Sequence, residues 1–226
     1  MRQGKSRIKV DKKQSVTAAL VVAHPDDETL WAGGTVLMHQ GWQWTVVSLC
    51  RGGDRDRAPR FLRAVQELGG MEKMGNLDDG PEQLPLDETE VQQVLLSLLP
   101  SEHFDLILTH SPYGEYTRHR RHEETSQAVV ALWEKGLIGA DEVWMFAYED
   151  SGKGGGDDLP RAIKTAHLMV HLPEEIWWGK YRTITEIYGF GPESYEARIT
   201  PREEAFWCFR SPVSFQKWLS TERRKQ

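Results

Sequence analysis

An imidazole and three carboxylates occur together near the start of the chain, in His24-Pro25-Asp26-Asp27-Glu28. They follow an apolar run over 18–22 that is typical of a buried strand, and they precede a segment over 29–38 that is typical of a helix. In an open α/β sheet such a turn lies at the carboxyl end of a strand, where ligands bind. Histidine and aspartate suit a borderline divalent metal such as zinc, and a spare carboxylate could accept a proton from a water at that metal.

The same turn also has a purely structural explanation. Asp26 and Asp27 are good helix N-cap residues, and acidic side chains are favourable near a helix N-terminus. Farther along the chain, His119 and His122 lie beside arginines in a pattern that is typical of a solvated basic helix face. Each pattern alone is ambiguous, but both follow a predicted strand, and together they favour one shared metal site.

The elements that must position these residues alternate between strand and helix. Apolar and β-branched runs predict strands over 20–23, 43–49, 104–109 and 142–148. Apolar residues at helical spacing, with Gly or Pro stops, predict helices over 28–40, 60–68, 88–99 and 123–135. The remaining segments are predicted as a loop over 51–56, mostly turn over 75–86, a helix over 165–171 and a strand over 180–188. This alternation predicts an α/β fold: a single-domain, Rossmann-like three-layer sandwich with a mostly parallel central sheet.

Length and composition support one ordinary domain. The chain has 226 residues, 39% of them hydrophobic, and its formal net charge is −6. We expect residues 1–17 to form a mobile basic arm and 18–226 to form the domain. The acidic balance argues against nucleic acid as a partner, and no apolar stretch reaches the roughly 20 residues of a transmembrane segment. Two cysteines and the lack of a signal-peptide pattern favour a reducing, cytoplasmic location.

Three stretches resemble the LmbE/PIG-L family of zinc-dependent N-deacetylases, over roughly 18–130. The first is Ala-His-Pro-Asp-Asp-Glu over 23–28, whose following helix carries Gly33-Gly34. The second is the run over 109–124 with its His-x-x-His element, and the third is the helical segment 60–69, which ends in Leu-Gly. The first motif alone is fairly specific, and its pairing with a downstream His-x-x-His is strong.

The resemblance implies one catalytic zinc ion and assigns a role to each matching residue. His24, Asp27 and His122 match the family's metal ligands, and Asp26 matches its general base. His119 matches the histidine that stabilises the tetrahedral intermediate and can protonate the leaving amine. Many relatives read His-Pro-Asp-His where this chain reads His-Arg-Arg-His over 119–122. The ligand histidine is retained, whereas the groups that surround His119 differ.

The expected activity is that of a zinc-dependent hydrolase that removes an acyl group, in the first place acetyl, from the amide nitrogen of a small molecule. The resemblance implies an N-acetylglucosamine-type sugar derivative as substrate. The alternatives are a metal-dependent amidase that acts on a non-sugar N-acyl compound and a metal-binding protein without turnover. Arg51 follows the second strand and is a candidate substrate contact. Arg60 and His110 are further candidates, with a solvated helix face and a structural histidine as their respective alternatives.

Two segments leave their role open. Residues 151–158, Ser-Gly-Lys-Gly-Gly-Gly-Asp-Asp, are a low-complexity stretch that predicts a surface connection or a lid over the substrate. The aromatic segment 206–209 is suited to packing inside the fold or between the subunits of a homo-oligomer.

Overall fold

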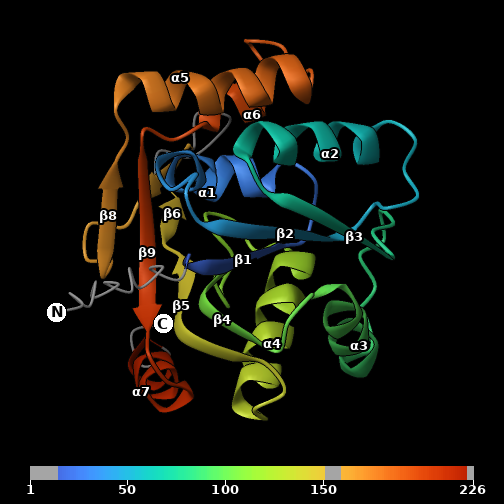
Figure 1. Cartoon of the computed structure of the whole chain (residues 1–226), viewed down its shortest axis with the longest axis vertical. Helices are drawn as coiled ribbons and strands as arrows, with labels where there is room; N and C mark the ends of the chain where they lie inside the picture. The colour runs from blue at the N-terminus through green and yellow to red at the C-terminus, as the bar shows by residue number, and fades with distance from the viewer. Residues whose placement is uncertain (1–14, 151–158, 223–226) are drawn as a thin grey trace, which may run out of the picture.

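A seven-stranded sheet forms the centre of the computed structural model, which describes residues 15–150 and 159–222 (Figure 1). Its strands are β1 (Thr17–Val22), β2 (Gln43–Cys50), β3 (Met71–Leu77), β4 (His103–Thr109), β5 (Gly139–Phe146), β8 (Leu168–His171) and β9 (Glu203–Phe209). A separate two-stranded sheet pairs β6 (Tyr148–Asp150) with β7 (Pro160–Ala162). Residues 1–14 of the predicted arm and the whole 151–158 segment lie outside the described residues.

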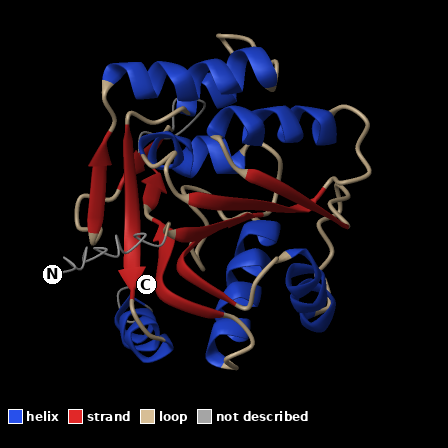
Figure 2. Cartoon of the chain, viewed as in Figure 1, coloured by secondary structure: helices blue, strands red, loops and turns tan. Residues whose placement is uncertain are grey.

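Helices cover both faces of the sheet, as Figure 2 shows. Helices α1 (Asp27–Met38) and α2 (Arg57–Leu68) cover one face, with α5 (Glu174–Arg182) packed on the outer side of α1, and α3 (Glu88–Leu98), α4 (Arg120–Glu134) and α7 (Pro212–Glu222) cover the other. A π-helical turn, η1 (Thr183–Ile187), continues α5, and the short α6 (Tyr195–Ile199) precedes β9. The three-layer α/β sandwich expected from the sequence is confirmed.

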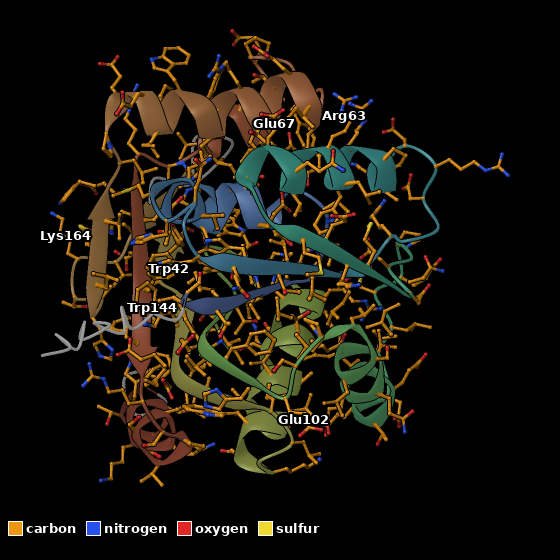
Figure 3. All side chains as sticks on the ribbon, viewed as in Figure 1. Trp42, Arg63, Glu67, Glu102, Trp144 and Lys164 are labelled. Carbon is orange, nitrogen blue, oxygen red and sulfur yellow. The ribbon has the colours of Figure 1, made fainter. Side chains whose placement is uncertain are left out.

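Apolar side chains fill both spaces between the sheet and the helices (Figure 3). Alternate residues of the buried strand β1 point to opposite faces: Ala19 and Val21 join one core, and Leu20 and Val22 join the other. Polar side chains such as Arg63 on α2 are exposed (Figure 3). In the ranges that the structure describes, no helix has the length and apolarity needed to cross a bilayer.

The strand order, β3-β2-β1-β4-β5-β9-β8, reverses direction beside β1. The chain runs outward from β1 through β2 to β3, and then returns to place β4 on the other side of β1. These strands, together with β5, are parallel, so Val21 of β1 pairs with Thr109 of β4 near their carboxyl ends. Such a switch point is where open α/β sheets bind ligands, and it brings the residues after β1 and β4 together.

The far edge of the sheet differs from the sequence prediction. Strands β9 and β8 are antiparallel to their neighbours. The predicted helix over 165–171 is wrong, because residues 168–171 form strand β8. The predicted strand over 180–188 is also wrong, because it lies in α5 and η1, where buried Lys180, Ile184 and Tyr188 face the protein interior.

Candidate metal centre

The side chains of the two aspartates in the turn between β1 and α1 point in different directions. Asp26 has a φ of 107°, which is unusual for a residue other than glycine and is the kind of strain found at functional sites. It occupies the N-cap position of α1, yet its side chain makes no capping hydrogen bond. Its Oδ2 accepts instead from Nη1 of Arg57 at 3.1 Å. Asp27 points inward, where its Oδ1 accepts from the indole N–H of Trp31 at 3.1 Å. Helix capping therefore does not explain why residue 26 is an aspartate.

Three predicted ligand atoms form a nearly equilateral triangle. Nδ1 of His24 lies 3.2 Å from Oδ2 of Asp27 and 3.2 Å from Nε2 of His122, and the latter two atoms are 3.3 Å apart. Ligands at about 2.0–2.1 Å from a tetrahedral zinc ion lie about 3.3 Å from one another. The donor set and its spacing therefore fit three corners of a zinc tetrahedron, and the fourth corner is available to water or substrate.

Each of the two histidines of the triangle also faces a carboxylate outside it, which determines the ring nitrogen that carries the proton. Asp79 Oδ1 lies 3.1 Å from Nε2 of His24, and Glu115 Oε2 binds Nδ1 of His122. An ionised carboxylate only accepts hydrogen bonds, so the ring nitrogen that faces it carries the proton. The opposite nitrogen of each ring faces Asp27, and there a bound metal ion would take the place of a proton, as at other metal-binding histidines with carboxylate partners.

His110 has a supporting position beneath the triangle. Its ring is fully buried, and its Nδ1 donates to Oε1 of Glu115 at 2.8 Å. Its Nε2 lies 3.5 Å from Oδ2 of Asp27, which would allow a second metal-binding group with His122. That nitrogen already accepts the backbone N–H of Ala23 at 3.0 Å, so its lone pair is in use. His110 is therefore a structural histidine, and the expectation that it contacts substrate is not supported by its burial.

His119 stands directly before α4, at the edge of the triangle. Its ring stacks on His122 with centroids 4.4 Å apart and meets the ring of His24 edge-on at 4.7 Å. Its Nδ1 is buried and has no hydrogen-bond partner among the described residues. Burial, followed by the charges of the neighbouring histidines, lowers the pKa of His119 to about 4. The imidazole is therefore neutral near pH 7 and can donate one N–H.

The surroundings of Asp26 increase the proton affinity of its carboxylate. Burial is the largest cause that raises the pKa of Asp26 well above its usual range, and the neighbouring charge of Asp27 acts in the same direction. The guanidinium of Arg57 opposes both effects. A carboxylate with a raised pKa is a better proton acceptor than an ordinary one, which suits a general base.

The triangle opens into a cavity of about 390 Å³, within the range of small-molecule sites. Asp26, His119 and Arg51 line it, and a substrate contact by Arg51 stays a prediction. Arg60 lies outside this cavity. Its Nε donates to Asp56 at 2.9 Å and its Nη1 donates to the carbonyl of Tyr188, so its place in the structure does not support the predicted role.

Three residues of this centre had no role in the sequence prediction. Glu115 lies inside the second motif, and its position between His110 and His122 in the sequence could have indicated that it binds both rings. Asp79 lies in a stretch predicted as turn, and Arg57 lies just before a predicted helix. Nothing in the local pattern of either residue indicates that it reaches the site.

Comparisons with known proteins agree with this geometry. The family model for PIG-L, described as GlcNAc-PI de-N-acetylase, matches residues 19–133. A 1D-myo-inositol 2-acetamido-2-deoxy-alpha-D-glucopyranoside deacetylase of Actinosynnema mirum is 45% identical over 58 residues, which are 23% of this chain and 20% of that protein. The chain thus matches about a fifth of the length of that relative.

Solved structures share the fold at low sequence identity. A deacetylase triple mutant from the teicoplanin biosynthetic pathway superposes with a TM-score of 0.61 at 15% identity, over 86% of this chain and 98% of that one. A 4-carboxy-2-hydroxymuconate hydratase from Pseudomonas putida superposes with a TM-score of 0.54 at 18% identity, over 85% of this chain and 95% of that one. The fold therefore accommodates different reactions, and the reaction must be argued from the site. With its family match over half of its length and both motifs assembled into one centre, the chain belongs to the PIG-L family.

Proposed function

We propose that this protein is a zinc-dependent N-deacetylase that acts on an N-acetylglucosamine-type sugar derivative. The triangle formed by His24, Asp27 and His122 is the observation that carries the proposal, because it presents three zinc-type donors at zinc-type spacing. The family membership and the deacetylase among the solved structures support the same reaction class.

In this proposal His24, Asp27 and His122 hold the ion, and Asp79 and Glu115 orient the two histidines. When bound, zinc supplies Lewis-acid polarisation of the acyl carbonyl and a lowered pKa for water. The five side chains come from three segments of the chain, which the fold brings together at the carboxyl ends of the central strands.

The remaining chemistry falls to Asp26 and His119. Asp26 accepts the proton of the attacking water, and its raised pKa lets it return that proton to the leaving nitrogen as the C–N bond breaks. The neutral His119 donates an N–H hydrogen bond to the oxyanion of the tetrahedral intermediate. We therefore assign proton delivery to Asp26 and give His119 an electrostatic role.

The cavity walls favour a polyhydroxylated ring as substrate. Arg51 and Asp79 line the cavity and provide a donor and an acceptor for hydroxyl groups. Tyr116 and Tyr195 also line the cavity, with ring centroids 6.0 Å apart, and such aromatic faces can pack on a sugar ring. These side chains support the sugar over a simple non-sugar amide.

The Asp26→Asn variant tests the assigned base. We expect it to bind zinc as tightly as the parent protein and to lose about 10²- to 10⁴-fold in kcat on an N-acetylated sugar, the usual effect of removing a general base. Asp56→Asn, at an exposed carboxylate outside the cavity, is the matched control and should retain the parent rate. Full turnover by Asp26→Asn would refute the role of Asp26.

A further inference from the structure

The side chain of Arg121 is buried, at 1% exposure, directly beside His122 in the first turn of α4. Its Nε donates to the carbonyl of Asp78 at 2.6 Å, and its Nη2 donates to the carbonyl of Leu84 at 2.9 Å. Its Nη1 binds Glu124, which neutralises the buried charge. One guanidinium thus holds both ends of the segment 78–84, which uses the fixed fork geometry of arginine.

The segment that Arg121 holds carries Asp79, the carboxylate that joins the metal centre to the cavity wall. Oδ1 of Asp79 accepts from Nε2 of His24 at 3.1 Å. Oδ2 of the same carboxylate accepts from Nε and Nη2 of Arg51, at 2.8 and 2.7 Å. A shift of residue 79 would therefore disturb a proposed metal ligand and a proposed substrate contact together.

The segment depends on side chains for its position. Residues 78–84 belong neither to β3 nor to α3, and a backbone hydrogen bond from Gln83 to the carbonyl of Gly80 closes a turn within the segment without tying it to the rest of the fold. Just beyond it, Glu124 accepts the backbone N–H of Leu86 at 3.0 Å. Arg121 and Glu124, both on α4, therefore attach this segment to the helix that supplies His122.

We propose that Arg121 is a positioning residue that clamps residues 78–84, so that Asp79 orients His24 and holds Arg51 at the cavity. The effect on substrate rests on the proposed function, whereas the effects on the metal site and on the segment do not. Through this clamp, the helix that carries one metal ligand sets the orientation of another.

The test compares Arg121→Met with Arg120→Met, since Arg120 is the exposed neighbour on the same helix. We expect Arg121→Met to bind zinc 10- to 100-fold more weakly in competition with a chromophoric chelator, the usual effect of disturbing a partner of a metal-binding histidine. Amide hydrogen exchange should become faster over 79–84 while the middle of α4 stays protected. Arg120→Met should change neither quantity, and Arg121→Lys should restore part of the affinity.

A double-variant cycle distinguishes action through Asp79 from a general loss of stability. If Arg121 acts through Asp79, adding Arg121→Met to Asp79→Ala should weaken zinc binding no further than Asp79→Ala does alone. Additive losses would overturn the proposal, as would parent-like zinc affinity and exchange in Arg121→Met. If Arg121→Met does not fold, Arg121→Lys takes its place in the cycle.

The proposed function is tested separately, with the parent protein. A parent protein that binds zinc but releases no amine from any N-acetylated sugar would refute the deacetylase proposal, and the clamp would still be tested by zinc affinity and hydrogen exchange. With an active parent, Arg121→Met should raise KM for the sugar more than it lowers kcat at saturating zinc, because Arg51 loses its support.

Discussion

Lys180 of α5 forms an ion pair with Glu204 of β9 that is closed to solvent. Nζ lies 2.6 Å from Oε1, and both side chains have 0% exposure. The same carboxylate accepts the backbone N–H groups of Gly34 and Thr35 in α1, at 2.8 and 2.7 Å. The pair therefore ties α5 and β9 to the helix that begins at Asp27, and its loss should strongly lower the free energy of unfolding.

We predict that Lys180→Met lowers the free energy of unfolding by about 3–5 kcal/mol, the usual cost of leaving one member of a buried pair uncompensated. With a urea m-value of about 3 kcal/mol/M, at the upper end of the range for small proteins because the chain is long, the unfolding midpoint should fall by about 1–2 M. Equilibrium urea unfolding, followed by tryptophan fluorescence and circular dichroism, measures this shift.

An exposed ion pair provides the matched control. Arg210 donates to Glu142 at 2.9 Å with 85% of its side chain exposed, so Arg210→Met should cost no more than about 1 kcal/mol. Adding Glu204→Gln to Lys180→Met should recover part of the loss, since no uncompensated charge then remains. A cost of less than about 1 kcal/mol for Lys180→Met would refute this reasoning.

Two further predictions concern the segment before α4. Glu115→Gln should weaken zinc binding by about 10- to 100-fold, since Glu115 orients His122, and an unchanged affinity in a chelator competition would contradict this role. Gly114→Ala should lower both Tm and zinc affinity, because Gly114 has a φ of 76° and a Cβ there would lie 2.3 Å from the carbonyl oxygen of Thr117. Gly136 is the control, because it has a φ of 67° and open space around it. Gly136→Ala should lower the Tm measured by thermal unfolding and leave zinc affinity unchanged. Equal losses of zinc affinity in the two alanine variants would count against the packing argument.

The parts of the molecule that were predicted correctly have strong local patterns. The strand, turn and helix around His24 and Asp27 combine a short apolar run with acidic residues at a helix start, and the structure has them as β1 and α1. His122 follows β4 as expected, because parallel strands bring their carboxyl ends to one edge of the sheet. The convergence of these three side chains then follows from the topology.

The parts that were missed depend on tertiary contacts. Residues 180–188 are rich in β-branched and aromatic types, yet they form α5 and η1 because burying one face against α1 outweighs their intrinsic preference. Asp79 lies in an irregular segment, and the contacts that hold this segment near His24 come from residues distant in sequence, such as Arg121. Arg57 reaches Asp26 across 31 residues of sequence, a contact that no local spacing indicates.

The most direct test measures free-amine release from a panel of N-acetylated sugars and non-sugar amides, using zinc-loaded protein with and without a chelator. We predict release from N-acetylglucosamine-type sugars that stops on zinc removal and returns when zinc is restored. Release from non-sugar amides alone would contradict the substrate class. No release from any member, with zinc verified as bound, would contradict the proposed deacetylase activity itself.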